Sequence, residues 1–232
     1  MSLNNGSHMN SIQVVDTLKW LKSGGFTYKD LHIQRTWDAF QFFKIQTELK
    51  KFELVEIYDK LELQNLSSTD VKVRLIFNND HPITYNHEIL KLDSLKTPIH
   101  LQIQDSLSLP DGLGPHTYKI NQQGHWNLLL NLKSAKADDV VSVNTANYLV
   151  EASRFNLFFY DPDQKICWTP TLSSGCLRGV FREKCLKEKN IYLPDKNKKV
   201  PLAEKDIPVS LGKKLTVYVG NSVRDLLPAM FV

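Results

Sequence analysis

The spacing of hydrophobic and polar residues in the first half of the chain predicts strands and helices in succession. Residues 13–20 are rich in apolar side chains and predict a strand, which a following glycine pair would turn into a hairpin. Asp30 is placed to cap a helix whose apolar residues recur at helical spacing as far as Leu49, before two closing lysines. A second helix is predicted at 55–63, and the alternation of Val71–Phe77 is typical of a strand.

The second half of the chain predicts a further set of strands and helices. Strands are expected at residues 99–103, 138–143, 148–160 and 215–219. Helices are expected at 116–132 and Val180–Glu188, the second of them after a loop at 169–176. The whole pattern indicates an α+β protein.

One loop divides the chain into two predicted domains. Residues 106–115 are rich in Ser, Pro, Gly and Asp, which is typical of a linker. We therefore expect an N-terminal α+β domain at 10–108 and a C-terminal domain at 109–232. Residues 1–9 have no apolar core or cleavage site of a signal peptide and are interpreted as an expression-vector remnant.

Composition and charge exclude several classes of protein. Of the 232 residues, 42% are hydrophobic and 23% charged, which excludes disordered, collagenous and coiled-coil chains. Every apolar run is interrupted by polar residues before it is long enough to span a membrane, so we expect a soluble protein. The 29 basic and 25 acidic residues leave a net charge of +4, too small for a nucleic-acid-binding surface but compatible with small anionic ligands.

Cysteine and histidine spacing gives no sign of a metal site. The three cysteines form no Cys-x-x-Cys pair, and the seven histidines show no metal-binding spacing. An odd number of cysteines also argues against a disulfide framework, so we expect a reducing cytoplasmic location. No metal is predicted.

Glu151 lies in a predicted strand with apolar neighbours on both faces. Burying an unpaired carboxylate costs several kcal/mol or more. Either Glu151 is exposed at a strand edge or a positive group lies against it.

A glycine-containing loop precedes the helix at Val180–Glu188. Gly175 and Gly179 lie in the sequence Ser-Ser-Gly-Cys-Leu-Arg-Gly-Val-Phe-Arg that ends at Arg182. Free backbone N–H groups at such a helix start suit a phosphate, although turn geometry alone also explains the glycines.

Together these two segments resemble the class IV, or fold type IV, pyridoxal-phosphate (PLP) enzymes, which include D-amino-acid and branched-chain aminotransferases and aminodeoxychorismate lyase. The resemblance rests on Glu-Ala-Ser-Arg-Phe-Asn-Leu-Phe, which starts at Glu151, and on the glycine loop after it. It implies that Glu151 faces the pyridine nitrogen of PLP and that the backbone amides of Val180 and Phe181 hold its phosphate. A protonated pyridine is then the cation that a buried Glu151 requires.

The family's Schiff-base lysine precedes this glutamate, and the resemblance favours Lys119. Lys119 lies 151 − 119 = 32 residues before Glu151, whereas Lys133 and Lys136 are too close and Lys96 precedes the predicted linker. The expected asparagine three residues after the lysine is displaced by one position, at Asn121.

Further site residues follow from matches near both ends of the chain. Leu-His-Ile-Gln-Arg, ending at Arg35, resembles the family's His-x-x-Arg, whose arginine binds the cofactor phosphate. The matching strand before it would place Thr17 near the substrate. The segment Val-Gly-Asn-Ser resembles the last active-site loop, so that Asn221 is expected at the cofactor and Ser222 at the substrate.

The resemblance also implies an overall architecture. A smaller N-terminal α+β domain and a larger, barrel-like C-terminal domain would hold PLP between them, as in D-amino-acid aminotransferase. We expect a homodimer that acts on a small amine or carboxylate substrate and contacts neither nucleic acid nor membrane.

Within the family, two features favour the lyase that converts 4-amino-4-deoxychorismate to 4-aminobenzoate and pyruvate in folate biosynthesis. The Arg-Gly-x-Gly-x-Arg-Gly-Tyr stretch of many aminotransferases is absent after the strand at Val71–Phe77, and Phe181 stands where aminotransferases often have Thr. The alternatives are an aminotransferase for branched-chain or D-amino acids and, because the segment before the first strand is short, an inactive homologue.

Overall fold

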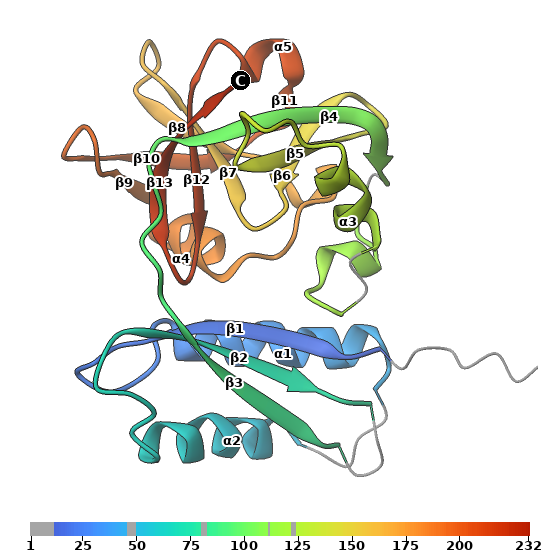
Figure 1. Ribbon diagram of the computed structural model, residues 1–232. Coiled ribbons are helices and arrows are strands. Elements are labelled where there is room, and N and C mark those ends of the chain that lie inside the picture. The colour runs from blue at the N-terminus through green and yellow to red at the C-terminus, as the bar shows by residue number, and fades with distance from the viewer. Residues whose placement is uncertain (1–11, 46–49, 80–82, 111, 122–123) are drawn as a thin grey trace, which may run out of the picture.

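Two β-sheets of unequal size organise the computed structural model (Figure 1). A small lobe holds a three-stranded sheet of order β1-β2-β3. A large lobe holds a ten-stranded sheet of order β11-β6-β5-β4-β13-β12-β7-β8-β10-β9. The structure describes residues 12–45, 50–79, 83–110, 112–121 and 124–232, so residues 1–9 and Leu49 lie outside it. Helices and strands in both lobes confirm the predicted α+β class.

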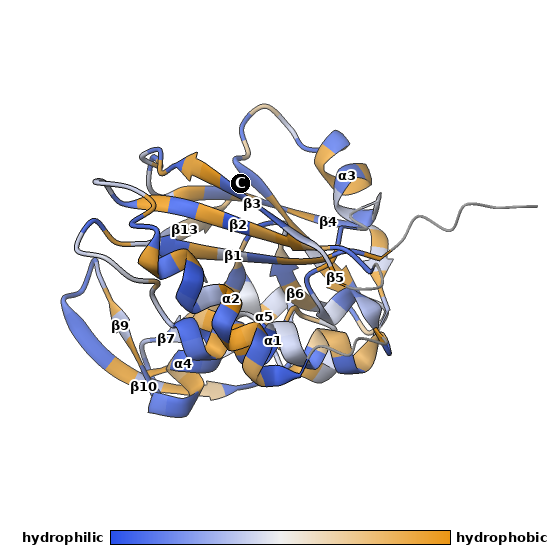
Figure 2. Cartoon of the chain, turned by 90° about the horizontal axis from the view of Figure 1, so that it is seen from below, coloured by the Kyte–Doolittle hydropathy of each residue, from blue (hydrophilic) through white to orange (hydrophobic). Residues whose placement is uncertain are grey.

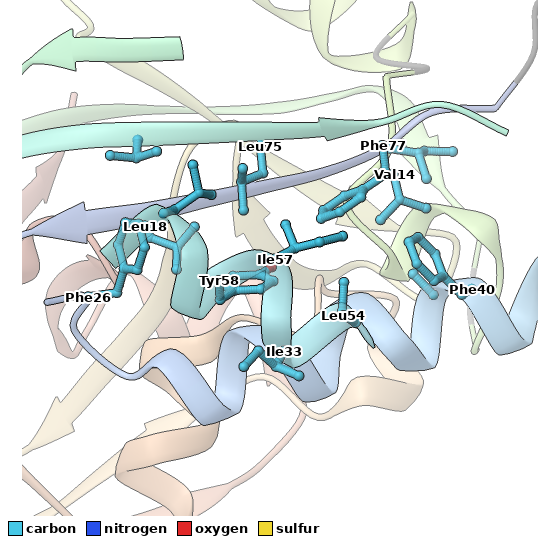
Figure 3. Close-up of a cluster of buried hydrophobic side chains, with 14 of the residues drawn as sticks. Val14, Leu18, Phe26, Ile33, Phe40, Leu54, Ile57, Tyr58, Leu75 and Phe77 are labelled. Atoms are coloured by element: carbon cyan, nitrogen blue, oxygen red, sulfur yellow. The ribbon is translucent and has the colours of Figure 1, made fainter. Parts of the chain in front are cut away.

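The small lobe packs two helices on one face of its sheet. Its elements are β1 (Val14–Trp20), α1 (Lys29–Phe42), α2 (Lys51–Leu63), β2 (Val71–Phe77) and β3 (Tyr85–Lys91). All neighbouring strands are antiparallel. Figure 3 shows the core, in which side chains of β1 and β2 point toward those of α1 and α2.

The period-two pattern of β2 decides which side chains face these helices. Val73 and Leu75 are fully buried in the core, whereas Lys72 and Arg74 alternate with them on the opposite face. The alternation of hydrophobic and hydrophilic colours along β2 is visible in Figure 2. The face away from the helices is therefore the polar one.

The two helices differ from prediction in their ends. Helix α1 begins after Tyr28 rather than at a cap on Asp30, and it ends at Phe42 because Lys44 adopts a left-handed backbone with φ of 49°. Helix α2 starts one turn earlier than predicted, because the Glu53 side chain accepts a hydrogen bond from the Lys50 N–H.

The turn after β1 leads into a helix instead of a second strand. Gly24 and Gly25 both have positive φ, and a single bridge joins Trp20 to Phe26 before the chain enters α1. The partner of β1 is β2, so the predicted local hairpin is replaced by a long-range strand pair.

The large lobe closes six strands into a barrel. Its first elements are β4 (Ile99–Leu109), α3 (Gly124–Asn131), β5 (Asp139–Asn144), β6 (Tyr148–Ala152), β7 (Asn156–Asp161) and β8 (Ile166–Thr169). They are followed by α4 (Val180–Glu188), β9 (Asn190–Leu193), β10 (Lys198–Glu204), β11 (Ile207–Pro208), α5 (Val209–Gly212), β12 (Thr216–Asn221) and β13 (Asp225–Phe231). An additional pairing of β6 with β7 closes the ring β6-β5-β4-β13-β12-β7.

Two hydrophobic clusters cover the two faces of the barrel wall. Leu157 and Phe159 of β7 pack inside the barrel, while Phe158 and Tyr160 pack on its outside with Phe181 of α4. Because both faces of β7 are covered, all six of its residues are buried, and its middle reads Leu-Phe-Phe-Tyr without polar alternation.

The predicted strand at 148–160 is two strands. The chain reverses at residues 153–155, where Ala152 and Phe155 exchange backbone hydrogen bonds, and Glu151 then pairs with Asn156. This turn brings Glu151 and Asn156, five residues apart in sequence, side by side.

The division between the sheets does not fall at the predicted boundary between 108 and 109. Strand β4 extends to Leu109 and belongs to the large lobe, so the crossing between sheets occurs at residues 92–98. After β4 the chain returns to the small lobe for a short stretch, in which Tyr118 and Ile120 pack in the core of that lobe.

The helix predicted at 116–132 is interrupted by this stretch that packs on the small lobe. A short 3₁₀ helix (Pro115–Thr117) is followed by an extended segment in which Ile120 bridges to Val14, and helix α3 starts only at Gly124. The long-range pairing with β1 outweighs local helical spacing here. In the described part of the chain, no helix is long and apolar enough to cross a membrane.

Candidate active site

A cavity of about 460 Å³ lies between the two lobes. Both lobes supply its wall, including β1, β2, the start of α4 and the turns that follow β6 and β12. Seven of the eight predicted site residues line it, namely Thr17, Arg35, Lys119, Glu151, Val180, Asn221 and Ser222. Tertiary folding therefore gathers positions that span most of the chain.

Lys119 reaches the cavity from the extended segment beside β1. Its carbonyl accepts a hydrogen bond from the Val15 N–H at 2.9 Å, and its Nζ donates to Thr17 Oγ1 at 2.7 Å. Burial, together with nearby cations of which Arg35 has the largest effect, lowers the pKa of Lys119 to about 7. A substantial fraction of this amine is thus uncharged and nucleophilic at neutral pH.

The other lysines considered from the sequence lie elsewhere. None of these three lysines lines the cavity. Lys96 and Lys136 are exposed, and the half-buried Lys133 donates to the Ala137 carbonyl instead. Asn121 pairs with Gln13 beside β1 and is likewise not a wall residue.

Glu151 is buried, with 6% of its surface exposed, and faces the cavity from the end of β6. Burial raises its pKa to about 8, although the Leu177 N–H, 3.0 Å from Oε2, and the more distant Arg182 partly oppose that rise. No described basic side chain forms an ion pair with it. The site therefore contains a carboxyl group that requires a cation to ionise at neutral pH.

Asn156 links Glu151 to the loop before α4. Its Nδ2 lies 3.4 Å from Glu151 Oε2 and donates to the Leu177 carbonyl at 3.1 Å. Gly179 packs so closely that a Cβ there would lie 1.7 Å from Asn156 Oδ1. Glycine is thus required because the Asn156 amide occupies the position of its side chain.

The start of α4 forms one end of the cavity. Gly179 and Val180 line it, and no side chain in the described part of the protein caps this helix, so the first-turn N–H groups are available to an anion. The side chain of Phe181 lies outside the cavity and packs on Phe158, at 5.9 Å between ring centres, and close to Gly220. Its predicted part in the site concerns the backbone amide alone.

Arg35 faces the same end of the cavity from α1. Its Nη2 donates to Asp16 Oδ1, and among the described residues the guanidinium makes no other hydrogen bond to protein. Arg35 and the start of α4 together form a strongly electropositive corner.

The turn after β12 closes another side of the cavity. The side chain of Asn221 holds this turn, because its Oδ1 accepts from the N–H groups of Val223 and Arg224 and its Nδ2 donates to the Arg154 carbonyl. Ser222 Oγ donates to the Thr17 carbonyl at 3.3 Å. These contacts join the large lobe to the strand whose Thr17 holds Lys119.

Several wall residues were not found from the sequence. They are chiefly further cations and aromatic or imidazole groups: Lys72, Arg74, Arg154, Arg224, His116, Tyr118, His125 and Trp126. Among the described wall residues Glu151 is the single acid, so the cavity is strongly positive. The polar positions in the alternating strand at Val71–Phe77 were the available signal for the first two.

Neither metal binding nor thiol chemistry has support in the described structure. No group of three or more potential metal ligands occurs among those residues. The three cysteines are free and buried, and burial raises the pKa of each thiol to about 12. These thiols are therefore unreactive at neutral pH.

A family model agrees with this arrangement. The model described as amino-transferase class IV matches residues 13–230 of the chain. No curated protein matches the chain.

Solved structures show the same fold at low sequence identity. A hypothetical aminotransferase from Mycobacterium tuberculosis, in a form with α-ketoglutarate and PMP bound, gives a TM-score of 0.78 at 15% identity, over 100% of this chain and 86% of that one. A proposed 4-amino-4-deoxychorismate lyase from Legionella pneumophila gives 0.76 at 17%, over 94% and 82%. The Escherichia coli branched-chain amino acid aminotransferase gives 0.76 at 15%, over 97% and 78%.

Proposed function

Because the chain belongs to the class IV aminotransferases, a family of PLP-dependent enzymes, we propose that it is a lyase that converts 4-amino-4-deoxychorismate to 4-aminobenzoate and pyruvate. One observation carries the proposal. A single cavity holds a buried amine with a pKa of about 7, a buried carboxyl group and a surplus of cations.

The residues of the cavity fit PLP. Glu151 would face the pyridine nitrogen, since a protonated ring is the cation that this buried carboxyl group requires. Arg35 and the free N–H groups at the start of α4 would hold the phosphate. When bound, PLP provides a protonated ring that withdraws electrons from the substrate carbon next to the nitrogen.

Lys119 would attach the cofactor and then transfer protons. With PLP bound, the uncharged Nζ would act as the general base that takes the proton from the substrate carbon. Thr17 Oγ1, 2.7 Å away, accepts a hydrogen bond from Nζ and so orients it. A pKa of about 7 allows the same amine to accept a proton and return it.

The charge of the wall supports a substrate with more than one carboxylate. Lys72 forms no ion pair with a described residue, and Arg74 has only the partly exposed Glu88 at 3.7 Å as its partner. Both lie across the cavity from the large lobe, on the polar face of β2. They would orient the carboxylates of aminodeoxychorismate while its enolpyruvyl group leaves as pyruvate and the ring becomes aromatic.

An aminotransferase for branched-chain or D-amino acids is the second candidate. Leu90, Leu95, Leu109 and Trp126 form an apolar part of the wall that suits an aliphatic side chain. The likeness to the E. coli branched-chain enzyme is in keeping with this activity.

We also infer a cytoplasmic homodimer. Strand β3 is an unpaired edge of the small sheet and exposes Ile89 (45%) and Leu90 (36%), which a second copy would cover. Leu90 is also a wall residue, so the dimer contact would adjoin the cavity. Light scattering of the wild type and of Ile89→Lys tests this, and a monomeric wild type would contradict it. The free buried thiols fit a reducing compartment.

The decisive experiment adds PLP to the purified protein, records the visible spectrum and then supplies aminodeoxychorismate. A visible band followed by 4-aminobenzoate and pyruvate is the expected result. A band without these products, but with keto acids from a panel of D- and L-amino acids, would replace the lyase by the aminotransferase. No band at all would favour an inactive homologue.

A further inference from the structure

Asp16 is fully buried beside the cavity without lining it. It lies on β1 between Val15 and Thr17, which both line the wall. Because side chains alternate along a strand, Asp16 points to the helix-covered face, where Leu18 of the same strand packs with Tyr58 (Figure 3). Substrate and cofactor in the cavity therefore have no direct access to this carboxylate.

Three side chains from two helices donate to this carboxylate. His32 Nδ1 lies 2.8 Å from Oδ1 and 3.0 Å from Oδ2, and the Tyr58 hydroxyl donates to Oδ2 at 2.8 Å. Arg35 Nη2 donates to Oδ1. Thr36 in turn lies 3.1 Å from the Tyr58 hydroxyl. The carboxylate is thus held on both oxygens.

The charges in this cluster are arranged so that Asp16 stays ionised. Burial alone would raise the pKa of Asp16, but the charges of His32 and Arg35 and the hydrogen bonds from His32 and Tyr58 hold it well below its usual range. Burial lowers the pKa of His32, although the charge of Asp16 opposes that fall. Arg35 is the member of the cluster that keeps its charge at every pH, so it is the permanent cation that balances the buried carboxylate.

Arg35 is the member of the cluster that reaches the cavity. Its side chain is 10% exposed and lies at the end where Gly179 and Val180 begin α4. A guanidinium has five N–H donors, and Asp16 engages it through Nη2 alone. The remaining donors face a corner suited to a phosphate.

We propose that Asp16 is a positioning residue, which fixes the Arg35 guanidinium so that its free N–H groups face the start of α4 and bind the phosphate of the cofactor. The proposal rests on the proposed PLP-dependent function. Asp16 contributes orientation from behind the wall, since an arginine side chain loses much rotational freedom when it is held in one geometry. His32 and Tyr58 hold Asp16 in turn.

The test compares binding of PLP with that of pyridoxal, which lacks the phosphate. Cofactor is removed from the whole protein, and dissociation constants are measured by equilibrium dialysis for wild type, Asp16→Asn, Arg35→Gln and the double variant. We expect Asp16→Asn to weaken PLP binding roughly tenfold or more, from the usual strength of a charge-assisted hydrogen bond, and to leave pyridoxal binding almost unchanged. In the Arg35→Gln background, Asp16→Asn should have little further effect.

Two further variants keep the test sound if Asp16→Asn is poorly folded. Asp16→Glu keeps the charge but moves the carboxylate by one methylene, so it should also weaken PLP selectively. Tyr58→Phe removes one donor to Asp16 and leaves the contact between Asp16 and Arg35, so it should reduce the ratio of PLP to pyridoxal affinity less than Asp16→Asn does.

Equal losses for PLP and pyridoxal in Asp16→Asn and Asp16→Glu would overturn the positioning role and leave Asp16 a purely structural residue. The positioning role would also be overturned if the losses of PLP affinity in Asp16→Asn and Arg35→Gln simply added in the double variant. Wild-type protein that binds PLP no better than pyridoxal would instead refute the cofactor assignment, so the two failures are distinguishable.

Discussion

Two buried carboxyl groups belong to different lobes, Asp16 behind the wall of the cavity and Glu151 in that wall, and their pKa values shift in opposite directions. Asp16, in the small lobe, is covered by the helices of its own domain and receives hydrogen bonds from three side chains, including the cation Arg35. Glu151, in the large lobe, has a backbone N–H and a distant amide as partners. The pKa of Asp16 is well below its usual range, and that of Glu151 rises to about 8.

The difference shows that burial does not by itself decide the charge of a carboxyl group. Burial raises the pKa at both positions, and the partner decides the outcome. At Asp16 the protein supplies that partner, whereas at Glu151 we propose that bound PLP would supply it. A buried carboxylate that is paired with a cation of the protein indicates a structural or positioning role. A buried carboxyl group without such a cation indicates a binding site.

Lys119 lines the same cavity as Glu151, and its loss is expected to have the largest effect. Lys119→Ala should abolish the visible band of bound PLP and reduce turnover roughly a thousandfold or more, because the attaching and proton-transferring amine is gone. Absorption spectra and product formation measure this. Lys133→Ala is the control, since Lys133 is outside the cavity. A visible band retained in Lys119→Ala would refute the assignment.

Glu151→Gln tests the uncompensated carboxyl group. We expect PLP to bind but turnover to fall roughly a hundredfold, because a neutral amide does not hold the ring nitrogen protonated. Normal turnover would contradict the electron-withdrawing role.

Stability provides a second readout for Glu151. Since the folded-state pKa is raised from 4.5 to about 8, the unfolded state holds fewer protons between these values, and the free energy of unfolding falls as pH rises from 4.5 to 8. Cofactor-free wild type should lose roughly 3–5 kcal/mol relative to Glu151→Gln across this window in urea titrations. If the free energies of unfolding of the two proteins changed equally with pH, a charge in the folded protein would compensate Glu151, contrary to this prediction.

Asp16→Asn should change the pH dependence of the free energy of unfolding in the opposite direction. A lowered folded-state pKa contributes stability that is present above the unfolded value of 3.8 and is lost as pH falls through the folded value. Removing the charge leaves Arg35 without its partner and should lower the free energy of unfolding at neutral pH by roughly 3 kcal/mol. Acid titration of wild type and variant by circular dichroism should show the difference shrinking toward low pH, and a constant difference would contradict this account.

The contact between Thr17 and Lys119 predicts the smallest effect. The rate of covalent PLP capture should rise with pH and level off above about 7, as the amine loses its proton.

Thr17→Val removes one hydrogen-bond acceptor, worth about 1 kcal/mol, and should slow turnover severalfold at an unchanged fold. Thr17→Ser is the matched control and should resemble wild type. Equal rates in all three proteins would exclude a part for this hydroxyl.

Local sequence patterns identified much of the secondary structure. The alternation at Val71–Phe77 and the glycine loop before Val180–Glu188 gave the strand and the helix as observed. The family resemblance also selected Lys119 and Glu151, which share the cavity. The strand and the helix could be found because periodicity and glycine spacing are local features of the chain.

Other features depend on distant contacts. Burial on both faces concealed the turn within 148–160, and pairing with β1 replaced the predicted helix around Lys119 by an extended segment. The exposed edge strand β3 has no alternating burial to reveal it. Such elements are decided by partners far away in the sequence, so local spacing does not encode them.

The sequence by itself determined the family resemblance, the lysine and glutamate of the site and the mixed fold class. Only the tertiary structure showed that Asp16 is paired and Glu151 is not, and that cations of β2 and of the turn after β12 face one cavity. The physical reason is that the sequence gives only the residue type of a carboxylate and not its surroundings in the folded protein. Its charge depends on the dielectric and the donors that folding brings to it.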